Sequence, residues 1–260
     1  NVHLSVDSGR NLVDSVGLSP VHTWYVNRLG ALPSLPEPLM QQRLLLELAD
    51  QTYDNLMSAG FIEYYLRQPY TNPMGARYLS GTLLNQPGAI RQHPWVKELR
   101  GRVELLARGN PLKANRYNFE DPAGTPASLR LGKKGFTVLS FYRTGPDAYP
   151  PEADRARAEH RFVERKLMTD SLFQNITFVG VSRDASGALW QLYQRDEKFS
   201  WRHYREMPRR GRVLSDILPL FPQGPTYLLL TREGTPIGIY PSLQLVVNSI
   251  KWRVKQASRP

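Results

Sequence analysis

Residues 136–142 have the sequence FTVLSFY, and residues 176–182 have the sequence ITFVGVS. Both runs are rich in aromatic and β-branched residues, a composition that favours β-strands. Residues 152–168, between them, place apolar side chains on one stripe of a helix and charged side chains elsewhere. A strand, a crossover helix and a second strand predict a parallel βαβ unit.

The C-terminal segment continues this pattern. Residues 226–231 (TYLLLT) predict a strand, Gly234 a turn, and residues 236–240 (PIGIY) an antiparallel return. Apolar residues between 243 and 254 recur at helical spacing and predict a closing amphipathic helix. The expected order is strand, helix, strand, helix, hairpin, helix.

The first half of the chain has a helical pattern. An apolar face is expected to run from residue 39 to a stop at Gly60, and further helices are expected over 61–66 and 95–107. The face comprises Leu39, Leu46, Ala49, Tyr53 and Leu56. Glycine and proline are frequent over residues 109–135, which favours a domain boundary there. We therefore divide the chain into an N-terminal extension with a proline-rich connector (1–38), a helical region (39–130) and a second domain (131–260).

Composition restricts the chemistry. The chain has 34 Lys and Arg against 23 Asp and Glu, a net charge of +11, which suits nucleic acid, an anionic membrane surface or an acidic protein. It has no cysteine, which excludes disulfides, thiolate nucleophiles and cysteine-based zinc sites. The uncharged run 234–250 contains prolines and glycines and is too short to span a membrane, so no transmembrane helix is predicted. The chain begins at Asn1, which is consistent with a removed leader.

Two motifs resemble thioredoxin. The segment PTYLLL beginning at Pro225, followed by Gly234 and Gly238, resembles the thioredoxin segment that starts at its cis-proline. The second motif, Thr144-Gly145-Pro146-Asp147, resembles the Cys-Gly-Pro-Cys redox loop, with Thr144 and Asp147 at the cysteine positions. The resemblance implies an α/β thioredoxin-like domain, with a cis bond before Pro225 facing this degenerate redox loop.

We predict no catalytic residue, cofactor or metal site. Thiol–disulfide exchange needs a thiolate, whereas Thr144 has an unactivated hydroxyl and no base nearby in sequence. The alternative is that the Gly-Pro pair is simply a turn. The histidines lack metal-ligand spacing, and His160, on the stripe of a predicted helix, is expected to be a core residue.

The whole chain is similar to the TraF-type pilus assembly proteins of F-type conjugation systems. Three features carry this resemblance: Trp24-Tyr25 ahead of the proline-rich connector, Phe141-Tyr142-Arg143 at the end of the first strand, and VGVSRD at residues 179–184. It implies an exported, periplasmic component of a type IV secretion machine. Some members of this family have lost their redox cysteines.

A basic–aromatic segment, residues 198–212, is the candidate partner-binding site. Its predicted contact residues are Lys198, Trp201, Arg202, Tyr204, Arg205, Arg209, Arg210 and Arg212. Arginines interleaved with aromatic rings suit a protein interface, and they also suit single-stranded nucleic acid. A third interpretation is a solvated loop anchored to the core by its rings.

The favoured hypothesis is a non-catalytic assembly or scaffold protein whose redox-inactive thioredoxin-like domain binds other protein subunits. The alternative is a basic nucleic-acid-binding component of a larger particle, and an enzyme of another class is third.

Overall fold

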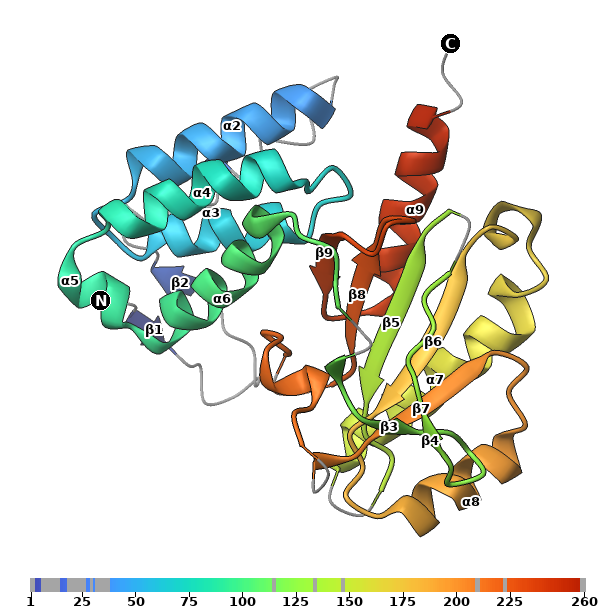
Figure 1. Ribbon diagram of the computed structural model, residues 1–260. Helices are drawn as coiled ribbons and strands as arrows, with labels where there is room; N and C mark the ends of the chain where they lie inside the picture. The colour runs from blue at the N-terminus through green and yellow to red at the C-terminus, as the bar shows by residue number, and fades with distance from the viewer. Residues whose placement is uncertain are drawn as a thin grey trace.

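The computed structural model describes residues 3–5, 15–17, 27–28, 30, 38–113, 116–132, 135–145, 148–208, 211–221 and 224–257. A group of helices lies beside a seven-stranded sheet that carries its own helices (Figure 1). Near the N-terminus, β1 (His3–Ser5) and β2 (Ser15–Gly17) form an antiparallel pair. The Trp24-Tyr25 pair and prolines 33 and 36 of the connector lie outside the described residues.

The helical region has its own apolar core. Its helices are α2 (Pro38–Gln51), α3 (Met57–Leu66), α4 (Pro73–Asn85), α5 (Gly88–Gln92) and α6 (Pro94–Arg108). Local sequence sets several ends: the Asn72 side chain accepts the Gly75 N–H at 2.9 Å, and Gly109 ends α6 with a φ of 61°. The predicted helices over 61–66 and 95–107 are confirmed as parts of α3 and α6.

The predicted stop at Gly60 is wrong. Gly60 is buried inside α3, and the break comes earlier, where the Thr52 hydroxyl donates to the Leu48 carbonyl as α2 ends. Because α2 ends at Gln51, Tyr53 and Leu56 leave the predicted apolar face and are exposed.

The second domain has the expected order. It contains β5 (Thr137–Tyr142), α7 (Pro150–Phe162, continued by a π-helical turn over Val163–Leu167), β6 (Thr177–Ser182), α8 (Gly187–Glu197), β8 (Thr226–Leu230), β9 (Pro236–Tyr240) and α9 (Leu243–Ala257). Strands β5 and β6 are parallel, while β8 runs antiparallel to both β5 and β9. This order and these directions confirm the thioredoxin-like fold.

One edge of the sheet extends beyond the predicted strands. Strand β7 (Arg202–Glu206) pairs parallel with β6, then antiparallel with β3 (Phe119–Glu120), which forms a hairpin with β4 (Pro126–Ala127). The sheet order is β4-β3-β7-β6-β5-β8-β9. Residues 119–127 therefore belong to the sheet, although the sequence placed them in the helical region.

The helical region covers the opposite edge, at β9. Helices α3 and α6 contact β9, and Trp252 of α9 packs against the core of the helical region (Figure 1). The Arg253 guanidinium donates to the carbonyl of Thr71, and the Ser249 hydroxyl donates to that of Pro69 at 3.3 Å. Among the described residues, no helix is long and apolar enough to cross a membrane.

Candidate functional site

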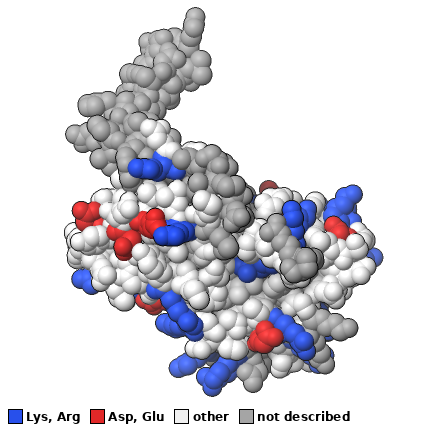
Figure 2. Space-filling view, turned by 90° about the horizontal axis from the view of Figure 1, so that it is seen from above, with Lys and Arg blue, Asp and Glu red and all other residues white. Residues whose placement is uncertain are grey.

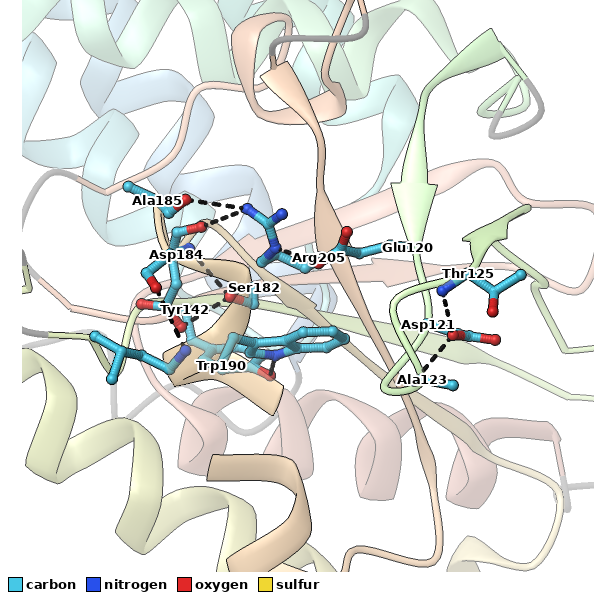
Figure 3. Close-up of polar contacts among 12 residues, drawn as sticks. Glu120, Asp121, Ala123, Thr125, Tyr142, Ser182, Asp184, Ala185, Trp190 and Arg205 are labelled. Atoms are coloured by element: carbon cyan, nitrogen blue, oxygen red, sulfur yellow. Dashed lines mark hydrogen bonds and ion pairs between the residues drawn. The ribbon is translucent and has the colours of Figure 1, made fainter. Parts of the chain in front are cut away.

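The loop after β5 is held by one carboxylate. Asp184, which follows β6 and is 2% exposed, accepts the N–H groups of Thr144 at 2.8 Å and Gly145 at 2.7 Å. It also accepts the hydroxyls of Thr144 at 3.0 Å and Ser182 at 2.8 Å. Figure 3 shows Asp184 beside Ser182. Four donors on one buried carboxylate make this loop a fixed structural unit.

The Thr144 hydroxyl is part of the internal hydrogen-bond network. Its side chain is buried and its hydroxyl donates to Asp184, whose oxygens already accept three other donors. Its carbonyl accepts the Arg157 guanidinium at 3.1 Å. Pro146 and Asp147, the other half of the predicted loop, lie outside the described residues. Thr144 and Gly145 are therefore held in place by their hydrogen bonds to Asp184.

The predicted cis bond before Pro225 is wrong: none of the described peptide bonds is cis, and the Gly224–Pro225 bond is trans. Gly224 has a φ of 110°, a value that glycine adopts without strain and other residues rarely do, and its N–H donates to the Glu152 carboxylate. Burial raises the pKa of Glu152, which the nearby Arg143 and Arg183 partly offset. Gly224 thus has a backbone conformation that favours glycine, and a trans bond leads into β8.

A buried polar and aromatic cluster, absent from the sequence predictions, joins β5 to α8 and β7. The Tyr142 hydroxyl accepts from Trp190 Nε1 at 3.1 Å and Gln194 Nε2 at 3.0 Å, and it lies 3.0 Å from His203 Nδ1. These side chains are all buried. Isolated polar residues on separate elements carry no sequence pattern, so only the fold brings them together.

Two buried histidines complete this cluster. His160 is a core residue, as expected: its ring nitrogens lie 3.1 Å from the Ser140 hydroxyl and 3.2 Å from that of Tyr193. Burial lowers the pKa of His160 to about 3. The pKa of His203 lies well below its usual range, mainly because the ring is buried and to a smaller extent because His160 is close. Both imidazoles are therefore neutral at pH 7. Among the described residues, no group of His, Asp and Glu could hold a metal ion.

Two rings of the basic–aromatic segment are buried in the fold. Trp201 and Tyr204 are each 6% exposed, and they pack on opposite faces of the sheet. The prediction that these two residues form an exposed docking surface is wrong, because strand alternation turns their side chains into the two cores. Within the described part of the chain, Trp201 Nε1 and His203 Nε2 have no hydrogen-bond partner.

The arginines of this segment divide into two kinds. Arg205 is an internal clamp: its Nε donates to Glu120 at 2.6 Å, and its Nη1 donates to the carbonyls of Asp184 at 3.1 Å and Ala185 at 3.3 Å (Figure 3). In contrast, Lys198, Arg202 and Arg212 are exposed. Arg209 and Arg210 lie outside the described residues.

One observation weighs against the nucleic-acid hypothesis. Bases stack on exposed rings, whereas Trp201 and Tyr204 are buried and Phe199 is partly buried. On the face shown in Figure 2, Lys and Arg side chains are spread over the surface.

No protein-family model matches the chain, and no curated protein is similar to it in sequence. Solved structures similar to it include the thioredoxin domain of a thiol-disulfide oxidoreductase from Bacteroides vulgatus, at 18% identity and a TM-score of 0.41, covering 55% of this chain and 99% of that one. A thiol:disulfide interchange protein from Bacteroides sp. has 18% identity, a TM-score of 0.41 and coverage of 55% and 88%. A peroxiredoxin-like protein from Aquifex aeolicus has 11% identity, a TM-score of 0.38 and coverage of 55% and 89%. We base the fold assignment on the strand order and directions described above.

Proposed function

We propose that this chain is a non-catalytic assembly component whose thioredoxin-like domain binds other protein subunits. One observation carries the proposal. At the position of the redox loop, the Thr144 hydroxyl is bonded to buried Asp184, in a chain with no cysteine. The loop that does the chemistry in a thioredoxin is here part of the internal hydrogen-bond network. A fold that has lost its reactive groups still offers surfaces for other proteins.

The finer proposal is that the protein is exported and works in the periplasm as part of a conjugative type IV secretion or pilus assembly machine. It rests on the similarity to TraF-type proteins at Phe141-Tyr142-Arg143, at residues 179–184 and at Trp24-Tyr25. In the structure, Ser182 and Asp184 of this motif hold the loop after β5. The motif therefore has a structural role in this chain.

Insulin reduction by dithiothreitol tests the chemical half of the proposal. We expect the protein to leave the uncatalysed rate unchanged, because no thiolate is present to attack a disulfide. A thioredoxin run in parallel is the positive control. Acceleration similar to that of the control would overturn the non-catalytic assignment.

Cell fractionation and co-purification test the biological half. A full-length precursor with a C-terminal tag should be found in the periplasmic fraction and should co-purify with envelope assembly subunits in near-stoichiometric amounts. Retention in the cytoplasm would contradict export. Recovery as a monomer with no stoichiometric partner, from cells that express the machine, would contradict the assembly role.

A further inference from the structure

Strand β7 has an edge that is only partly paired. On one side, β6 pairs with it from Arg202 to Arg205. On the other side, β3 pairs only with Arg205 and Glu206, and within the described ranges no strand pairs with residues 202–204 on that side. An unpaired strand edge presents main-chain N–H and C=O groups that an added strand could bind.

A groove of about 560 Å³ runs along this open edge. One wall is β7, from Trp201 to Tyr204, and the other comes from the β3–β4 hairpin and the residues after it. Pro122 and Pro126 line the hairpin wall, and proline has no N–H to donate to a neighbouring strand. The hairpin therefore borders the groove without pairing with β7 through these positions.

The groove is positively charged. Arg130 on the hairpin side and Arg202 on β7 both line it, both are exposed, and neither forms an ion pair within the described part of the chain. Asp121, an acidic residue in the lining, offsets one of these two positive charges, and its Oδ1 accepts the N–H groups of Ala123 and Thr125 at 3.0 Å (Figure 3). An acidic side chain in the groove would meet two free guanidinium groups.

We propose that an extended, acidic segment of a partner protein binds in this groove as an added strand on β7. The proposal rests on the assembly function above and specifies its contact site and the chemistry of the partner. Main-chain hydrogen bonds to residues 202–204 would supply affinity, and carboxylates facing Arg130 and Arg202 would supply selectivity. A second copy of this chain is disfavoured, because it would bring the same two arginines.

Fluorescence polarisation with a labelled peptide that alternates valine and glutamate tests this site. We expect saturable binding, and we expect a peptide with lysine in place of glutamate not to bind. Combining Arg202→Glu with Arg130→Glu should weaken binding by about 10-fold or more, since both charges that attract the peptide become repulsive. The matched control is Arg232→Glu, an exposed arginine in the turn between β8 and β9 that is not in the groove lining and should leave binding unchanged.

A second arm separates strand addition from simple charge attraction. The same peptide, methylated at alternate main-chain amides, should lose binding because it cannot complete the hydrogen bonds of an added strand. Equal binding of the methylated peptide would overturn the proposal.

A single-stranded oligothymidylate tests whether the groove is a general anion surface. If it binds as tightly as the peptide and loses binding in the same arginine variants, the proposal is also overturned. If the protein binds the peptide but also catalyses insulin reduction, the proposed function is wrong and this inference stands. If the peptide does not bind but partner subunits still co-purify in stoichiometric amounts, this inference alone is wrong.

Discussion

The loop after β5 and the open edge of β7 differ in how their polar groups are used. In the loop, the N–H groups of Thr144 and Gly145 and the Thr144 hydroxyl all donate to Asp184. Along the edge, residues 202–204 have no strand on one side within the described ranges, and Arg202 has no ion-pair partner there. The fold thus fixes the loop from within, whereas this edge of β7 has no pairing strand at residues 202–204 in the described ranges. The sequence motif resembles the thioredoxin loop, but the polar groups of that loop are already bonded inside the fold. The strand edge at residues 202–204 is the part without a pairing strand in the described ranges.

The largest expected effect concerns the side chain that anchors β7. Trp201→Ala should lower the free energy of unfolding by about 3–5 kcal/mol, because a nearly buried indole would leave a cavity. Trp201→Phe is the matched control. Since the indole nitrogen has no partner, this change loses ring volume but no hydrogen bond, and it should cost less than about half as much. Urea unfolding of both variants measures the difference. Equal stability of Trp201→Ala and wild type would show that the indole is not a core anchor.

The second prediction concerns Asp184, the carboxylate that holds the loop after β5. Asp184→Ala should lower the free energy of unfolding by about 3 kcal/mol, because it leaves buried donors of Thr144, Gly145 and Ser182 without an acceptor. Asp196→Ala, an exposed aspartate on α8, is the control and should stay within about 0.5 kcal/mol of wild type. Faster amide hydrogen exchange at Thr144 and Gly145 should accompany the loss. Unchanged exchange there would contradict the role assigned to the carboxylate.

Two arginines of strand β7 have different roles: Arg205 is paired inside the fold and Arg202 is exposed at the surface. Arg205→Ala should destabilise the protein by about 2–3 kcal/mol, because it leaves the largely buried Glu120 carboxylate unpaired. Arg202→Ala, three residues earlier and exposed, should change stability by less than about 0.5 kcal/mol. Thermal melts of the two variants should therefore differ clearly. Similar melts would remove the distinction between the two arginines.

The smallest expected effect is a dependence on pH. His160 and His203 have folded-state pKa values below the unfolded value of about 6.5, so the stability of burying them neutral is present above that pH and is lost as pH falls below it. Between pH 7 and pH 6, the pair should together lower the free energy of unfolding by about 1.4 kcal/mol. Denaturant unfolding at the two pH values measures this change.

A matched variant identifies the source of the pH dependence. His160→Gln removes one titrating ring and should reduce the loss between pH 7 and pH 6 by about half. Burial raises the pKa values of Glu152 and Glu206, which acts in the opposite direction, since protonating these groups favours the folded state. That effect is the same in His160→Gln and in wild type, so the difference between the two proteins reports the histidine. The same loss in the variant as in wild type would point to other groups.

The sequence predicted the elements whose patterns are periodic and local. Strands β5, β6, β8 and β9 and helices α6, α7 and α9 follow from runs of apolar residues at fixed spacing. Strand β7 was missed because its sequence, RHYRE, looks polar until burial of His203 and Glu206 is known. The partners of Asp184 could not be predicted, since Thr144 and Gly145 lie about 40 positions away along the chain. Composition likewise could not show that Arg205 forms an ion pair with Glu120 whereas Arg202 is exposed.

Arg130 and Arg202, beside β7, also affect how readily copies of this protein associate with one another. Sheet edges are where identical chains join and begin to aggregate, and proteins protect such edges with like charges. Were two molecules to meet edge to edge at β7, the guanidinium groups of Arg130 and Arg202 from both copies would be brought close together. That repulsion is screened by salt over a distance of about 8 Å at physiological ionic strength. The protein should therefore stay dispersed in dilute buffer and begin to self-associate as salt is added.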